Sequence, residues 1–169
     1  MGLFARIFGL GLACLLAGCS GGDGDGSEAS GSLAACEPDT FRITGTLDGE
    51  AVSHSGELGG HGWIQSSAGS TLDTPFEGGG SFHAEWQGVV ADGETFTATG
   101  NVNLPVTGPR GGETLKYASG SLTKRDDGVT FTLSGLTASV QCITAPCPNG
   151  AVQGSLQGCV EWEPFGSTP

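Results

Sequence analysis

The sequence predicts an all-β domain: a single antiparallel meander of about eight or nine strands, closed as a small barrel or folded as a β-sandwich. Two observations lead to this prediction. Apolar side chains alternate with polar ones at a period of two in several segments, and short glycine-containing turns separate those segments. Helical periodicity is absent beyond residue 18. Glycine inside several expected strands indicates bends and bulges, which slightly favours the barrel.

The clearest hairpin is expected between residues 81 and 104. In its first strand, Ser81 to Val90, one face carries Phe82, Ala84, Trp86, Gly88 and Val90. In its second strand, Glu94 to Leu104, one face carries Phe96, Ala98, Gly100, Val102 and Leu104. The other face of both strands is polar, and Ala91-Asp92-Gly93 lies between them. This pattern predicts an antiparallel hairpin with one face on the core and one in solvent.

The remaining strands follow from the same alternation and from turn dipeptides such as Asp48-Gly49 and Asn149-Gly150. We expect them at Thr40–Leu47, Glu50–Ser55, around Trp63 and Ile64, from Leu115 toward Leu122, and at Val129–Leu133, Leu136–Cys142 and Ala151–Val160.

Four cysteines fall within the expected domain: Cys36, Cys142, Cys147 and Cys159. An even number of cysteines in an exported chain predicts disulfides. Of the three possible pairings we favour a Cys142–Cys147 staple, which leaves Cys36–Cys159 to join the first strand to the last. A zinc site at the cysteines is the alternative, but C-x4-C is wider than the usual C-x2-C spacing and no histidine lies near it in sequence.

The N-terminus has the features of an export signal. A single cation, Arg6, precedes an apolar stretch from Ile7 to Ala17, which is about half the length that a bilayer-spanning helix needs. The stretch ends in Leu16-Ala17-Gly18-Cys19. This sequence resembles the lipobox of bacterial lipoproteins, in which a branched apolar residue and two small residues precede an obligatory cysteine. The resemblance implies diacylglycerol transfer to the Cys19 sulfur and cleavage between Gly18 and Cys19.

These features divide the chain into four expected parts. Residues 1–18 are the signal peptide, 19–35 the lipidated cysteine and a Gly/Ser/Asp tether, 36–164 the all-β domain and 165–169 a C-terminal tail. The tether contains too little apolar surface to offset its ordering entropy, and as a coil it should reach roughly 20 Å. Ser20 stands where an Asp usually retains lipoproteins at the inner membrane, so the resemblance implies the outer membrane if the host has two membranes.

The charge of the chain argues against two kinds of partner, nucleic acids and anionic lipid surfaces. The formal net charge is −12, and removal of Arg6 with the signal leaves five basic and 18 acidic side chains, a charge of −13. An acidic surface disfavours nucleic acids and anionic lipid surfaces. The Walker, dinucleotide-binding and HExxH motifs are absent, and we expect no cofactor.

Candidate chemistry is limited to a few side chains. His54, His61 and His83, with Glu85, form a zinc or copper site if the fold brings them together; otherwise they are exposed polar residues. Glu85 and His83 share one face of a strand. Trp63, between Gly62 and Ile64, is the best candidate for an exposed aromatic that binds a ligand.

These observations predict a cell-envelope lipoprotein that is a non-enzymatic binding or structural module held on a membrane by its lipid. Its protein or small-molecule ligand and its oligomeric state are open. One alternative is a small metal-dependent enzyme or metal-binding protein that uses the three histidines. Another is a ligand carrier with a cavity inside the barrel.

Overall fold

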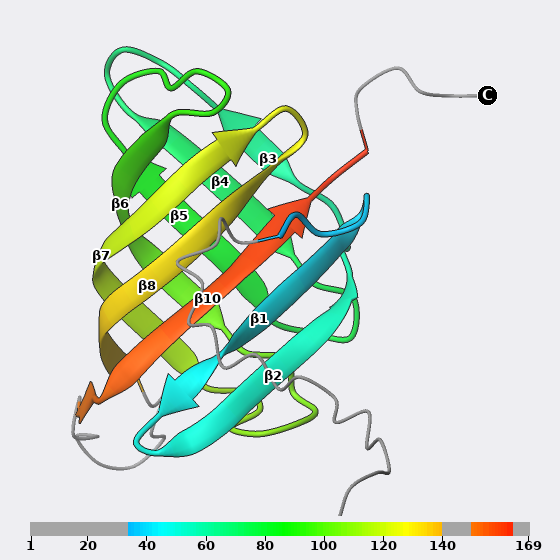
Figure 1. Ribbon diagram of the computed structural model, residues 1–169, viewed down its shortest axis with the longest axis vertical. Coiled ribbons are helices and arrows are strands. Elements are labelled where there is room, and N and C mark those ends of the chain that lie inside the picture. Colours follow the sequence, from blue (N-terminus) through cyan, green and yellow to red (C-terminus); the bar gives the residue numbers. More distant parts are fainter. Residues whose placement is uncertain (1–33, 140–149, 164–169) are drawn as a thin grey trace, which may run out of the picture. The chain divides into compact units, whose positions relative to one another are not determined.

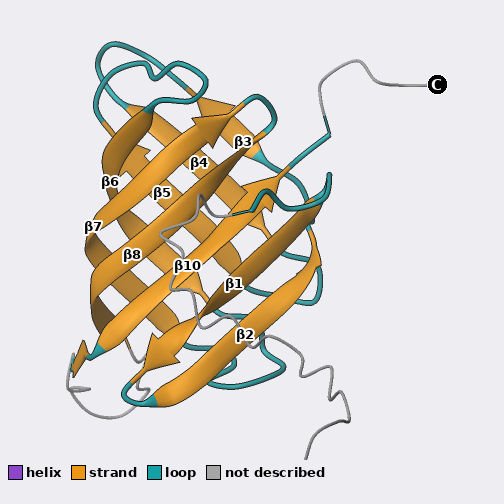
Figure 2. Ribbon diagram, in the orientation of Figure 1, coloured by secondary structure: helices purple, strands orange, loops and turns teal. Residues whose placement is uncertain are grey.

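The structure is a computed structural model that describes residues 34–139 and 150–163. Within these ranges the chain forms strands and loops (Figures 1 and 2), and no helix there is long and apolar enough to cross a membrane. The strands are β1 (Thr40–Leu47), β2 (Glu50–Glu57), β3 (Gly62–Ile64), β4 (Ser70–Pro75), β5 (Ser81–Trp86), β6 (Thr95–Asn103), β7 (Thr114–Arg125), β8 (Gly128–Ser139), β9 (Ala151–Val152) and β10 (Gly154–Glu161).

Nine strands form one continuous antiparallel sheet in the order β2-β1-β10-β8-β7-β6-β5-β4-β3, and the short β9 pairs with β8. The sheet curls into a half-barrel (Figure 1). Of the two predicted architectures, barrel and sandwich, the structure is therefore closer to the barrel. An isolated bridge between Leu58 and Phe76 joins the chain after β2 to the chain after β4. The bridge therefore links β2, at one end of the strand order, to β4, the strand next to the other end.

The core fills the concave side of the sheet. The rings of Phe82 on β5 and Phe131 on β8 stack with centroids 4.6 Å apart, and those of Phe41 and Phe76 stack at 3.8 Å. Aliphatic side chains from the same faces surround these rings: Ile43, Leu47, Leu72, Leu115, Leu122, Leu133 and Leu156 are fully buried. Burial at roughly 25 cal/mol per Å² of apolar surface is the main stabilising term.

The predicted alternation is confirmed where apolar residues occupy the inward face. Strand β1 has the predicted bounds, and Phe41, Ile43 and Leu47 point inward as expected. In the predicted hairpin, Phe82, Ala84 and Trp86 of β5 face Ala98 and Val102 of β6 across the buried side. One member of the predicted inward face, Phe96, is only partly buried against the core.

Strand β4 was not predicted, because two polar residues occupy its inward face. Ser70 and Thr74 are buried on either side of Leu72, so the strand lacks apolar alternation. Both hydroxyls are satisfied locally: Ser70 donates to the Gly88 carbonyl over 2.6 Å, and Thr74 donates to the Phe82 carbonyl over 3.3 Å. Buried polar groups with such partners are compatible with a core.

Several strand boundaries differ from the prediction: β5 ends at Trp86 and not at Val90, and β2 continues to Glu57 and not only to Ser55. Residues 128–139 form one strand instead of two, because the ladder to β7 resumes at Leu136 directly after Ser134, with only Gly135 unpaired between them. The predicted strand 151–160 is instead two strands, because Gln153 bonds with Asp48 through both its backbone groups. Gly154 follows with φ +122°, and a Cβ there would collide with the Thr46 carbonyl, so this break requires glycine.

Candidate functional site

All three tryptophans of the chain gather at one end of the domain. Trp63 is the central residue of β3, Trp86 ends β5, and Trp162 follows β10. The Trp63 ring lies 4.8 Å from that of Trp86 and 5.7 Å from that of Trp162, centroid to centroid. His61 stacks on Trp162 at 4.9 Å, and Phe96 packs on Trp86 at 4.9 Å. We call the end marked by these three tryptophans the tryptophan end.

The tryptophan end is buried inside and apolar outside. Trp86 and Trp162 are buried, whereas Trp63 is half-buried. The adjacent Ile64 is 65% exposed, and Val89, in the loop after β5, is 66% exposed. Exposed large aliphatic side chains next to an aromatic cluster are typical of contact surfaces.

Two hydrogen bonds tie together the loops that carry these aliphatic residues. The Gln65 side-chain carbonyl, next to Ile64, accepts the backbone N–H of Val90 over 2.7 Å. Ser70 donates to the Gly88 carbonyl. The residues that flank Val89 are thus held against the loop that follows Ile64.

Lys124 brings a positive charge to the tryptophan end. Its ammonium lies 5.7 Å from the centroid of the Trp63 ring, within the range of a cation–π interaction. The same ammonium forms an ion pair with Asp92. The hydrogen bond from Lys124 holds the pKa of the Asp92 carboxyl below its usual value.

The start of the domain lies beside the tryptophan end. The Asp39 backbone carbonyl accepts the N–H of Leu58 over 2.8 Å. The Asp39 carboxylate accepts the N–H of Glu163, next to Trp162, over 3.0 Å. Three residues before Asp39, Cys36 is joined to Cys159 of β10, and the Cα atoms of this disulfide are 5.7 Å apart. The predicted Cys36–Cys159 pairing is therefore confirmed.

The indole N–H of Trp86 is buried and finds no hydrogen-bond acceptor in the part of the chain that the structure describes. Such a donor costs free energy compared with one that is satisfied. The Trp86 ring is packed between Trp63 and Phe96.

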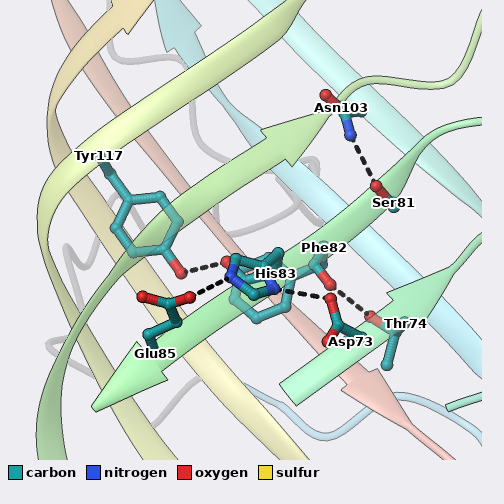
Figure 3. A network of polar contacts seen from close by, with 8 residues as sticks. All are labelled: Asp73, Thr74, Ser81, Phe82, His83, Glu85, Asn103 and Tyr117. Carbon is teal, nitrogen blue, oxygen red and sulfur yellow. Dashed lines mark hydrogen bonds and ion pairs between the residues drawn. The ribbon is translucent and has the colours of Figure 1, made fainter. Parts of the chain in front are cut away.

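A second polar constellation lies on the outer face of β4 and β5. Figure 3 shows His83 between two carboxylates: its Nδ1 lies 2.6 Å from Asp73 and its Nε2 lies 3.1 Å from Glu85. Asp73 and His83 are paired neighbours on β4 and β5. Partial burial alone lowers the pKa of His83, but the hydrogen bonds and charges of the two carboxylates outweigh this effect, so the pKa is raised.

Tyr117 of β7 supports this constellation from the buried side. Its hydroxyl reaches across β6 and donates to the His83 carbonyl over 2.7 Å (Figure 3). The path is open because Gly100 is opposite Tyr117, at a register shift in β6, and a Cβ on Gly100 would collide with the His83 carbonyl. Burial raises the pKa of the Tyr117 hydroxyl, so it remains a donor.

The structure does not bring the three candidate histidines together. His54 of β2 is buried under the loop between β6 and β7, with its Nε2 2.9 Å from the Pro109 carbonyl. His61 is at the tryptophan end, and His83 is on the outer face of β5. Only His83 and Glu85 meet, and both nitrogens of His83 already face carboxylates.

Among the described residues, 34–139 and 150–163, no group of three or more His, Cys, Asp or Glu side chains is arranged to hold a metal ion. The convergence that the histidine hypothesis requires is therefore absent from these residues.

The other predicted site residues have mixed outcomes. Trp63 is less exposed than expected, because Trp86 and Trp162 pack against it. Cys142, Cys147 and the lipidation residue Cys19 lie outside the described residues. A sequence signal for the cluster did exist: β5 and β10 run in the same direction in the sheet, so tryptophans at their C-terminal ends lie at the same end of the domain.

Comparison with models of known protein families, with curated proteins and with solved structures finds no significant match.

Proposed function

We propose that the chain is a lipid-anchored envelope protein whose all-β domain is a non-enzymatic binding or structural module displayed on a membrane. The observation that carries the proposal is the Cys36–Cys159 disulfide. Disulfides form and persist in oxidising compartments outside the cytosol, which agrees with an export signal ending in Leu16-Ala17-Gly18-Cys19. The disulfide also fixes the first residues after the expected tether to the central part of the sheet.

The arrangement of polar groups supports a module rather than an enzyme. Catalysis lowers barriers by roughly 8 kcal/mol or more and uses several groups aimed at one reacting atom. The cluster of His83 with the carboxylates of Asp73 and Glu85 lies on the outer face of the sheet. Because both imidazole nitrogens face carboxylates, the histidine is positioned as a bridge between strands.

Metabolic labelling with a radioactive or clickable fatty acid tests the anchor. We expect the wild-type chain to be labelled and to sediment with membranes, and Cys19→Ala to lose both properties. Cys14→Ala is the matched control, because Cys14 lies in the same N-terminal segment and precedes the expected cleavage site. Equal labelling of wild type and Cys19→Ala would refute the proposal. If the host has two membranes, density-gradient separation should place the protein with the outer one.

A further inference from the structure

We propose that the tryptophan end docks on the lipid surface to which Cys19 holds the chain, with Ile64 and Val89 inserted among the headgroups and Trp63 behind them. The inference rests on the lipid anchor proposed above. It adds an orientation to that anchor: one end of the domain faces the membrane and the opposite end faces away from it.

Exposed aliphatic side chains are concentrated at the tryptophan end. In the described ranges only Ile64, Val89 and Val106 are large hydrophobic residues with more than half of their surface exposed. Two of the three are at the tryptophan end, on segments that hydrogen bonds tie together. Isolated exposed aliphatic residues are common. Here Ile64 points to the outer face of β3, opposite to Trp63, and it lies on a segment that is hydrogen-bonded to the one that carries Val89, so two exposed aliphatic side chains occur at one end of the domain.

Behind these aliphatic side chains lie Trp63 and Lys124. Tryptophan favours the membrane interface, because its ring is apolar and its N–H is polar. Lysine places its stem along apolar surface and its ammonium at the headgroup level. Here the Lys124 ammonium lies over the Trp63 ring and is paired with Asp92, and its side chain is only 13% exposed, so the half-buried Trp63 ring is the interfacial group at this end.

The proposed lipid anchor is close in sequence to the start of the domain. The lipid is expected at Cys19, and the first described residue is Ala34, fifteen positions later. A coil of this length and composition reaches roughly 20 Å, so the start of the domain stays close to the bilayer at a high effective concentration. Through Asp39, that start is hydrogen-bonded to the residues after β2 and β10, beside His61 and Trp162. A tether of this reach allows the tryptophan end to contact the lipid, and the apolar side chains described above favour that orientation.

The charges at this end select the kind of lipid. Asp92 is neutralised by Lys124, but Asp126 and Asp127, in the turn between β7 and β8, and Glu94 add negative charge there. Carboxylates repel anionic headgroups. The docked surface is thus zwitterionic lipid, and docking depends on apolar contact rather than on electrostatic attraction.

Tryptophan fluorescence tests this orientation, because Trp63, the one tryptophan that is not fully buried, lies at the proposed contact. The lipidated full-length protein is reconstituted into phosphatidylcholine–phosphatidylethanolamine vesicles, with or without brominated acyl chains. We expect the brominated vesicles to quench the part of the emission that comes from Trp63, because tryptophan at the interface lies close to the acyl chains. Ile64→Ser with Val89→Ser should restore most of the emission. Phosphatidylglycerol in the vesicles should weaken the quenching.

Val106→Ser is the matched control. Val106 is 69% exposed, like Ile64 and Val89, but it follows the C-terminal end of β6 and so lies at the opposite end of the domain. We expect this variant to be quenched like the wild type. Far-ultraviolet circular dichroism confirms that the variants are folded.

Flotation of the vesicles separates failure of the anchor from failure of the docking. Protein that floats with the vesicles but gives equal emission in brominated and ordinary lipid would overturn the docking and leave the anchor intact. Protein that does not float would overturn both. If detergent-free protein dimerises and the double serine variant does not, the surface that carries Ile64 and Val89 binds a second copy and the lipid assignment is wrong.

Discussion

Removal of the Cys36–Cys159 disulfide should greatly reduce the stability of the domain. The two cysteines are separated by 123 residues. Closing a loop of this length removes entropy from the unfolded chain that corresponds to about 5 kcal/mol at 25 °C. Small domains have a total free energy of unfolding of about 5–15 kcal/mol, so loss of the crosslink uses a large part of it.

Two single variants separate this loop effect from packing. Cys36 is partly exposed, whereas Cys159 is 1% exposed in the core. Cys36→Ala and Cys159→Ala open the same loop, but only the second also removes a buried sulfur. Urea titrations of a soluble form beginning at Ser20 should show a loss of about 2–5 kcal/mol for Cys36→Ala, and a loss at least as large for Cys159→Ala because it also removes buried packing. A loss in Cys159→Ala with none in Cys36→Ala would refute the reasoning.

Three further outcomes are expected from the polar contacts. Tyr117→Phe removes the donor to the His83 carbonyl and should reduce the free energy of unfolding by about 1–2 kcal/mol in urea titrations; no change would mean that this carbonyl is satisfied otherwise. Because the pKa of His83 is raised in the folded state, its protonation stabilises the fold fully below about pH 6.5, and this contribution declines as the pH rises through the raised value. The effect should stay under about 1 kcal/mol, because Asp73 and Glu85 are largely exposed, and His83→Gln should abolish this part of the pH dependence of the melting temperature. Ser70→Ala should cost about 1–2 kcal/mol and speed amide exchange in the loop after β5, whereas unchanged exchange would contradict its role as a tie.

Much of the sheet was predictable from local pattern. Strand β1 and the hairpin of β5 and β6 have apolar residues at every second position, so the bounds of β1 and the inward faces of all three strands follow from the alternation, although β5 ends at Trp86 and not at the predicted Val90. Strand β4 has Ser70 and Thr74 on its inward face, and their hydrogen bonds to β5 and the loop after it are tertiary features. No pattern within six residues could reveal these partners.

The candidate site was harder to predict, because its members meet only through the topology. Trp63, Trp86 and Trp162 are far apart in sequence, and their convergence depends on the direction of three strands. The partners of His54 and His61 likewise come from a loop and from the end of the domain. The pair His83 and Glu85 was predictable because both residues lie on one strand at a spacing of two.

The pairing of β1 with β10 has a consequence for the order in which the domain folds during synthesis and export. Every residue of β1 is paired with β10, which is more than a hundred residues later in the chain. The first hairpin can form early, but its other edge has no partner until the last strand is made, and such long-range pairing is slow. A chain with this connectivity stays incompletely folded until β10 has been made. If the chain is exported as proposed, the pairing of β1 with β10 and the Cys36–Cys159 crosslink would form only after the last strand has crossed the membrane.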